Sequence, residues 1–291
     1  MRVGLVGTGH WAAEVHAAAV VDTAEVELVG VWGRDPARTS TLAQRYGLRA
    51  HADPASLFAD VDAVMFAVPP SVQAPLAVQA ARAGCHLLLE KPTALTVEQA
   101  DAVTAAAADA GVATTVFVTM RHKAPVVAWL DDVVAQGGWS GAATHFVGHL
   151  AGSPFGDSPW RQEHGALWDV GPHALSLLLP VLGPVTAVTA ARGPADTVHL
   201  SLRHGEDASS VATLSHTVPE AAATLRFDVY GENGWAAVPA EHDQVGPVAA
   251  LSSALRSLVT AAGGGPAHPC DARFGAEVVR VLAAAQEQLD G

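Results

Sequence analysis

The first 120 residues alternate between short apolar runs and longer segments that are rich in alanine or end in glycine. The longer segments have the composition and end signals of helices. The apolar runs are nearly continuous, which is typical of parallel strands buried on both faces. They are RVGLV (2–6), VELVGVW (26–32), DAVMFAV (62–68), HLLLE (86–90) and ATTVFVT (113–119). The pattern predicts an α/β fold whose N-terminal domain, 1–120, is a doubly wound parallel sheet of the Rossmann type.

After about residue 120 the pattern changes. One helical stretch (125–137) leads into irregular sequence rich in Gly, Pro and Trp, and then into segments in which apolar and polar residues alternate. Such alternation, with turn residues between the segments, predicts a mostly antiparallel open sheet. Its expected strands are 186–191, 196–204, 209–218 and 224–234. We predict an α+β domain over 121–291, with a flexible connection at 261–269 and a final helix, 274–289, that packs back near the domain interface.

Composition narrows the possible partners. The chain has 291 residues, of which 50% are hydrophobic, and a formal net charge of −13. This charge repels nucleic-acid phosphates and anionic membrane surfaces, so we expect neither as a partner. The longest apolar runs fall short of the roughly 20 residues that a bilayer span needs, and Met1 leads directly into a strand without a cleavable leader. We expect a small-molecule substrate and a soluble, unprocessed chain.

Two cysteines, Cys85 and Cys270, form neither a disulfide framework nor a CxxC motif, which is consistent with a reducing cytoplasm. His145 and His149 fall on one face of a strand but have no third ligand at suitable spacing. We therefore expect a cytoplasmic protein without a metal site. The chain also lacks the Gly-x-Ser-x-Gly motif of a serine hydrolase.

The first predicted strand ends in a glycine turn, Gly7-Thr8-Gly9-His10-Trp11-Ala12, before a helix. In the pattern G-x-G-x-x-A the first glycine permits the tight turn, and the second lets a pyrophosphate approach the backbone. The small third residue keeps the helix close to the sheet, and the helix N-terminus supplies N–H donors. This setting favours a dinucleotide site over a purely structural turn.

The end of the second strand bears on the choice of cofactor. NAD-binding units usually place Asp or Glu there to hold the ribose 2′-hydroxyl. This chain has Trp32 and Gly33, followed by Arg34, whose guanidinium can bind a 2′-phosphate. NADP is therefore favoured over NAD. Asp35 weakens this preference, because it is either a ribose ligand or the start of a turn. For Arg34 the alternative is a solvated surface charge.

Four motifs occur in the order and approximate spacing of one family. They are the glycine turn (7–12), EKPTALT (90–96), RHKAP (121–125) and PWRQEHGALWDVGPH (159–173). Together they make nearly the whole chain resemble the glucose-fructose oxidoreductase / inositol dehydrogenase / rhizopine-catabolism family (Gfo/Idh/MocA). The resemblance implies a two-domain NAD(P)-dependent oxidoreductase whose second domain often serves oligomerisation. We accordingly expect a homo-oligomer, dimer or tetramer, formed through the C-terminal sheet.

The resemblance also implies roles for particular residues. Lys91 corresponds to the lysine near the nicotinamide and the substrate, Pro92 to a commonly cis proline, and Asp169 and His173 to the substrate ligand and the proton-transfer group. Lysine can stabilise a developing alkoxide, and histidine titrates near neutrality as a general acid/base. With a helix from Val170 onward, Asp169 would be its N-cap. The alternatives are a surface ion pair of Lys91 with Glu90, a plain helix cap at Asp169 and an ordinary half-buried His173.

Around these residues we predict two sets of contacts. The cofactor contacts expected are Gly7, Thr8, Gly9, His10, Trp11, Gly33, Arg34, Pro69, Glu90 and Lys91. The substrate contacts expected are Lys91, Arg121, Trp160, Arg161, His164, Asp169 and His173, with Trp168 nearby. Arg121 and Arg161 either bind a carboxylate or hydroxyls, or brace loops. His164 replaces a usual family glycine, and Gln73 stands near a usual family histidine, so a contact at each position is in doubt.

We predict an NADP-preferring or dual-specificity dehydrogenase or reductase that acts on a carbinol or carbonyl of a small polyhydroxylated or cyclic compound. One alternative is a non-catalytic NADP(H)-binding sensor on the same fold, because His164 and Gln73 depart from the family pattern. Another is a reductase of a less polar ring, such as an imine, enone or dihydrodiol.

Overall fold

The computed structural model describes residues 1–156 and 158–291. The described residues form two compact units. The first unit contains 1–122 and 245–279, and the second contains 123–244 and 280–291. The chain passes from the first unit to the second at residue 122, and 245–279 returns to the first unit, a return that we did not predict. The return has a physical cause: Leu251, Leu255 and Leu258 are buried in the core that also contains Val3 and Leu5.

The first unit is built on a six-stranded, all-parallel sheet in the order β3-β2-β1-β4-β5-β6. This is the strand order of a Rossmann fold, so the predicted fold class is confirmed. The strands are β1 (Arg2–Val6), β2 (Glu27–Trp32), β3 (Arg49–Ala50), β4 (Ala63–Phe66), β5 (His86–Glu90) and β6 (Thr114–Phe117). In such a sheet all strand-to-helix turns lie along one edge, where the ends of β1, β2 and β5 bring the predicted cofactor residues.

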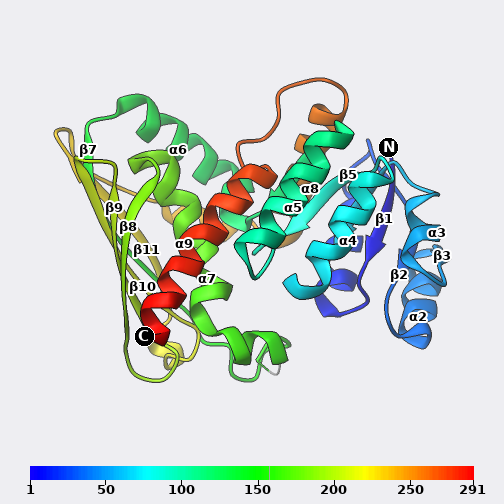
Figure 1. The fold of residues 1–291 in the computed structure, drawn as a ribbon, viewed down its shortest axis with the longest axis horizontal. Coiled ribbons are helices and arrows are strands. Elements are labelled where there is room, and N and C mark those ends of the chain that lie inside the picture. The colour runs from blue at the N-terminus through cyan, green and yellow to red at the C-terminus, as the bar shows by residue number, and fades with distance from the viewer. Residues whose placement is uncertain (157) are drawn as a thin grey trace. The chain divides into compact units, whose positions relative to one another are not determined.

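Helices cover both faces of this sheet, because its central strands are mainly apolar. Figure 1 shows α4 beside α5, and α8 packs against α1 and against β5 and β6. The helices are a π-helical segment η1 (Ala12–Ala17), α1 (Ala18–Val21), α2 (Pro36–Tyr46), α3 (Pro54–Phe58), α4 (Pro70–Arg82), α5 (Val97–Ala110), the 3₁₀ turn η2 (Thr119–His122) and α8 (Pro247–Ala262). Most obey the predicted end signals: Pro36 begins α2, and Gly47, with φ of 67°, ends it.

The second unit is built on a six-stranded mixed sheet in the order β12-β11-β7-β10-β9-β8. All neighbours are antiparallel except β7 and β10, which run parallel. Its elements are α6 (Ala124–Gln136), β7 (Trp139–Val147), α7 (Pro159–Leu182), β8 (Val185–Arg192), β9 (Val198–His204), β10 (Ala208–Ser215), η3 (Glu220–Ala222), β11 (Thr224–Gly231), β12 (Gly234–Ala237) and η4 (Ala240–Gln244). The last helix, α9 (Ala272–Asp290), contributes residues to both units.

One face of the mixed sheet is covered and the other is open. Along β9, Val198, Leu200 and Leu202 are buried, whereas the residues between them are exposed. The long helix α7 packs on the buried face, against β7, β9 and β10. Among the described helices α7 alone is long and apolar enough to cross a membrane, and 72% of its most apolar window is buried inside the protein. That burial is typical of a core helix.

Candidate active site

The turn after β1 requires glycine at Gly7. Its φ of +129° is a conformation that L-residues rarely adopt, and a Cβ there would lie 2.4 Å from the carbonyl oxygen of Ala67. The Gly7 N–H donates to the Trp32 carbonyl at 2.8 Å, so the turn is fastened to β2. Gly7 is therefore explained by the protein alone.

Gly9, two residues later, has no such explanation. A Cβ at Gly9 would meet nothing within 4 Å, and Gly9 does not belong to the positive-φ residues. Its carbonyl accepts from the N–H of Ala13 at 3.1 Å, so Gly9 lies directly before the helical segment η1. The backbone is left bare at the start of a helix, which is the cradle that a pyrophosphate occupies in dinucleotide-binding turns. The residues present thus fit a dinucleotide.

The end of β2 lies beside this turn. A Cβ on Gly33 would come within 2.6 Å of Thr8 Cγ2, so Gly33 and Thr8, both expected cofactor contacts, are neighbours. Asp35 is the N-cap of α2 and accepts from the N–H groups of Ala37 and Arg38 at 2.9 and 3.2 Å. These two hydrogen bonds give Asp35 a capping role at the start of α2. Arg34 is exposed, and the side chain of Arg38 donates to the Thr8 carbonyl at 3.3 Å.

Two N–H donors converge on one carboxylate oxygen at the end of β5. Glu90 Oε1 accepts from Trp11 Nε1 at 2.6 Å and lies 2.9 Å from Nε2 of His16, which is fully buried. Trp11 and Glu90, both predicted cofactor contacts, are thereby brought together. The carboxylate of Glu90 has these specific partners in the interior, which differs from the surface ion pair with Lys91 that we considered.

Gln73 holds the chain that follows Glu90. It is fully buried on α4, and its Nε2 donates to the carbonyls of Glu90, Pro92 and Thr93 at 2.8, 3.2 and 3.2 Å. Its Oε1 accepts from the Glu90 N–H at 2.8 Å. The Lys91–Pro92 peptide bond is cis, as the family resemblance implied. Gln73 therefore clamps the backbone on both sides of Lys91, and its departure from the family pattern has a structural role here.

Lys91 is one of only two lysines in the chain. The other, Lys123, lies in the second unit, where its Nζ donates to the His242 carbonyl at 2.8 Å and burial lowers its pKa. Lys123 thus braces η4 against the start of α6. Lys91 is half-buried and directly follows the strand and the clamp described above. Pro69 lies at the N-cap position of α4, and His10 is exposed within the glycine turn.

In the second unit α7 contains a kink that changes the expected role of Asp169. Gly165 has φ 63° and ψ −166°, so two helical segments meet there. The second segment therefore begins just after Gly165, and Asp169 lies inside the helix instead of capping a helix from Val170. Asp169 is buried and accepts from Arg161 Nε at 2.9 Å. A carboxylate this close to a helix N-terminus is stabilised by the helix dipole.

The other predicted substrate residues have varied surroundings. His173 stacks on Phe146, with ring centroids 6.3 Å apart. His164 packs edge-on against Trp168, whose Nε1 donates to Gln286 at 3.1 Å. Trp160 lies against the guanidinium of Arg161. Asp169, Arg161, His164, Trp160 and His173 thus belong to one helix of the second unit.

Arg121 belongs to the first unit, whereas Arg161 belongs to the second. Arg121 is buried, and its guanidinium lies 6.0 Å from the centroid of the Phe274 ring. Because Lys91 also belongs to the first unit, its convergence with Asp169 and His173 stays a prediction.

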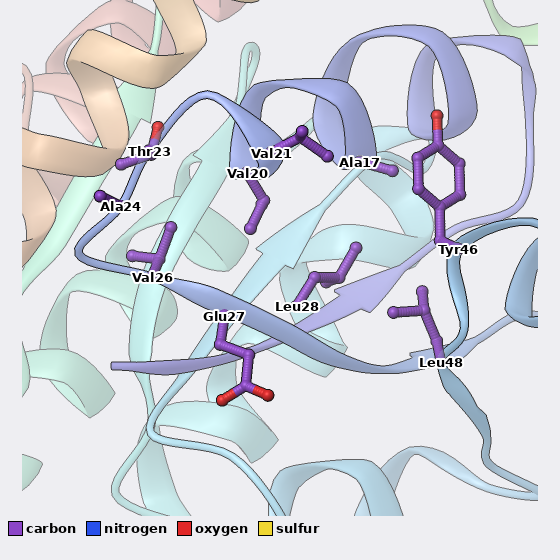
Figure 2. A pocket seen from close by; sticks show the side chains of 10 residues that line it. All are labelled: Ala17, Val20, Val21, Thr23, Ala24, Val26, Glu27, Leu28, Tyr46 and Leu48. Atoms are coloured by element: carbon purple, nitrogen blue, oxygen red, sulfur yellow. The ribbon is translucent and has the colours of Figure 1, made fainter.

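A hollow in the first unit carries none of the predicted site residues. It measures about 290 Å³ and is lined by Ala17, Val20, Val21, Thr23, Ala24, Val26, Glu27, Leu28, Tyr46 and Leu48. In Figure 2 the lining side chains are mostly apolar, and the carboxylate of Glu27 points away from the others. Without converging polar groups, this hollow does not resemble a catalytic or cofactor site.

Sequence reasoning missed two residues of this site, His16 and Arg38, and left the contact of Gln73 in doubt. His16 and Gln73 bind Glu90 and the following backbone, and Arg38 joins α2 to the glycine turn. One signal was available for Arg38, because it is a second arginine four residues after Arg34. The contacts of His16 and Gln73 join positions 74 and 17 residues apart in the chain, which a local pattern does not reveal.

Comparison with curated proteins gives partial matches. The chain is 28% identical over 196 residues to the uncharacterized oxidoreductase YdgJ of Escherichia coli K12, covering 65% of this chain and 56% of that protein. It is 37% identical over 103 residues to the UDP-N-acetylglucosamine 3-dehydrogenase of Acidithiobacillus ferrooxidans, covering 35% and 32%. The matched segments therefore span about half of these relatives or less.

Comparison with solved structures extends over the whole fold. The WlbA dehydrogenase from Bordetella pertussis, in complex with NADH and UDP-GlcNAcA, superposes with a TM-score of 0.86 and 21% sequence identity, covering 100% of this chain and 95% of that one. Family models match both units: "Oxidoreductase family, NAD-binding Rossmann fold" over residues 1–118, and "GFO/IDH/MocA C-terminal domain" over residues 132–237. With its glycine turn, its EKP strand end and its two matched domains, this chain belongs to the Gfo/Idh/MocA oxidoreductase family.

Proposed function

We propose that this chain is an NAD(P)-dependent oxidoreductase that transfers a hydride between the nicotinamide and a carbinol or carbonyl of a small polyhydroxylated or cyclic compound. The observation that carries the proposal is the bare backbone at Gly9, where no protein atom explains the glycine. Relatives support the substrate class, because they include an inositol 2-dehydrogenase and a UDP-N-acetylglucosamine 3-dehydrogenase.

The roles follow from the chemistry of the side chains. The nicotinamide, when bound, supplies or accepts the hydride. Lys91 polarises the reacting oxygen, His173 takes or gives its proton, and Asp169 orients the substrate or the histidine. Gln73 and Glu90 hold the turn that carries Lys91, through the hydrogen bonds of Gln73 to both sides of the Lys91 backbone.

We further propose that NADP is the preferred cofactor. Asp35 caps α2 through its Oδ1, which favours a capping role for this carboxylate over a ribose contact. Arg34 and Arg38 are both exposed at this point, and Arg38 reaches the Thr8 carbonyl. Two guanidinium groups beside the glycine turn favour a 2′-phosphate.

Replacement of Gly9 by alanine tests the cofactor site. The added methyl group meets no protein atom within 4 Å, so the urea midpoint should stay as in the wild type. The Kd for NADPH, measured by fluorescence titration, should rise about 10-fold or more, because the methyl group occupies the place of the pyrophosphate. The wild type should bind NADPH more tightly than NADH.

Gly7→Ala is the matched control for that experiment. Its methyl group collides with the Ala67 carbonyl, so it should destabilise the protein by more than about 3 kcal/mol whether or not a cofactor is present. Unchanged NADPH binding in Gly9→Ala would overturn the proposed cofactor site. Equal affinity of the wild type for NADPH and NADH would contradict the preference for NADP.

Two observations bear on the alternative functions. The clamp formed by Gln73 accounts for that residue structurally, so it no longer supports a sensor that has lost turnover. A hollow in the second unit includes Phe155 among its lining residues but also His149, Arg161 and Gln162, whereas Trp168 is buried outside it. Several polar groups favour a hydroxylated substrate over a less polar ring.

We also propose that the open face of the mixed sheet forms a homo-oligomer, either a dimer or a tetramer. Val211 and Trp235 are 52% and 72% exposed, and a shallow hollow on β8, β9 and β10 includes Val211 and His199. Exposed apolar groups on a sheet face favour contact with another copy. Light scattering should give a mass of two or four chains. Val211→Lys should shift it toward one chain, and a monomeric wild type would contradict the proposal.

A further inference from the structure

The second unit contains a hollow of about 550 Å³ beside the kinked helix α7. This volume is suited to a small-molecule ligand. It is lined by His149, Leu150, Ala151, Gly152, Ser153, Phe155, Gly156, Arg161, Gln162, Gly165, Asp196, His216 and Thr217. Since Arg161 also binds Asp169, the hollow adjoins a residue of the proposed catalytic set.

Most polar side chains in this lining already have partners within the protein. Gln162 donates to the Gly156 carbonyl at 3.2 Å, and Ser153 donates to the Leu150 carbonyl at 2.7 Å. His149 Nδ1 lies 2.8 Å from the Val218 carbonyl. These bonds hold the loop after β7, while the remaining polar atoms of His149 and Gln162 suit the hydroxyl groups of a ligand.

Asp196, the one carboxylate among the lining residues that the structure describes, is also engaged. It accepts from Ser215 Oγ, Thr217 Oγ1 and the His216 N–H, and its Oδ2 lies 2.6 Å from His216 Nδ1. Burial alone would raise its pKa, but these hydrogen bonds outweigh burial and hold the pKa below its ordinary value. Asp196 is therefore an ionised carboxylate whose charge is spread over four donors, which limits its repulsion of an anion in the hollow.

Arg161 contributes two terminal nitrogens that donate to no partner among the described residues. Its Nε donates to Asp169 Oδ2 at 2.9 Å, and its guanidinium carbon lies 5.1 and 4.9 Å from the ring centroids of Phe155 and Trp160. Its side chain is 22% exposed. Among residues 1–156 and 158–291, no acceptor contacts its two terminal nitrogens. The aromatic contacts and the Asp169 bond fix the plane of the fork, while these terminal N–H groups remain available.

We propose that Arg161 binds a carboxylate of the substrate, so that the preferred substrates are hydroxylated rings that carry an acid group, such as hexuronates. A carboxylate matches the two terminal nitrogens of a fixed guanidinium bidentately. Asp169 occupies only the Nε edge, so both carboxylates can be held at once. This inference rests on the proposed function and narrows its substrate class.

The experiment compares matched ligands in the presence of saturating NADPH, which binds alcohols in a complex that does not react. Dissociation constants of glucuronate, galacturonate, glucose, galactose and glucose 6-phosphate are measured by calorimetry with the full chain. At least one uronate should bind roughly 10- to 100-fold more tightly than its hexose, as expected for a charged hydrogen-bonded pair. Arg161→Gln should remove this ratio, whereas Arg161→Lys should retain part of it.

Arg203→Gln is the matched control, because it removes one exposed positive charge from the same unit and should leave the ratio unchanged. Equal binding of uronates and hexoses, or binding of neither, overturns the inference. So does an equal loss for both ligands in Arg161→Gln, which would indicate a bracing arginine. Tighter binding of glucose 6-phosphate than of either uronate would also overturn the inference, because it would show that Arg161 prefers a phosphate to a carboxylate. Oxidation of neutral polyols, followed separately at 340 nm, tests the proposed function whichever ligand binds.

Discussion

Replacement of Lys91 by methionine is expected to lower kcat/KM by about 10²- to 10⁴-fold, the range typical of lost acid–base or electrostatic assistance. Methionine keeps most of the length of the side chain but cannot stabilise a developing alkoxide. The clamp by Gln73 uses only backbone atoms on both sides of residue 91, so the turn should keep its shape. The Kd for NADPH and the urea midpoint should therefore change little.

The chain supplies a matched control, because its only other lysine is Lys123. Lys123 bonds the His242 carbonyl in the second unit, so Lys123→Met should cost some stability and leave the chemical step intact. The measurement is the steady-state rate at 340 nm over the pH range in which both proteins stay folded. A Lys91→Met variant with full activity would exclude Lys91 from catalysis, and an equal loss in both variants would indicate a nonspecific effect.

The fold of the first unit was largely predictable from sequence, because its signals are local. Each apolar run becomes a buried parallel strand, and Pro36 and Gly47 delimit α2 as expected. Residues 247–262 escaped notice, although they form α8. Their burial against η1, β5 and β6 depends on a return of the chain to the first unit, which no local pattern reveals.

The second unit shows where local reasoning ends. Residues 139–147 lie in a stretch that we judged irregular because of its Gly and Trp content, yet they form β7, a central strand that pairs with β10 and β11. Tertiary pairing outweighs weak strand propensity there. Asp169 was expected at a helix start from Val170, but Gly165 with positive φ moves that start several residues earlier. Motif spacing thus located these residues without giving their backbone geometry.

A second large effect is expected on the stability of the protein at acidic pH. Burial lowers the pKa of His122 to about 3 and that of His268 to about 4, and the two rings stack with centroids 4.4 Å apart. Arg121 faces both and disfavours their protonation, whereas Asp271 acts in the opposite direction on His268. Both folded-state values lie below the unfolded value of about 6.5. The unfolded chain therefore binds protons first, and the free energy of unfolding should fall as the pH drops from about 6.5 toward 4.

At pH 5 each of the two histidines should lower the free energy of unfolding by on the order of 2 kcal/mol, since one pKa unit corresponds to about 1.4 kcal/mol. His122→Phe separates this effect from general acid denaturation. Phenylalanine keeps the ring packing against Phe117 and His268 but loses the bond to the Val116 carbonyl. The lost bond should lower the free energy of unfolding by about 1 kcal/mol at every pH, while the acid-dependent penalty of His122 disappears. Urea unfolding at pH 7.5 and 5.0 should then show a smaller difference for His122→Phe than for the wild type. Equal differences would mean that His122 takes up its proton at the same pH in both states, and that its burial does not oppose the charge.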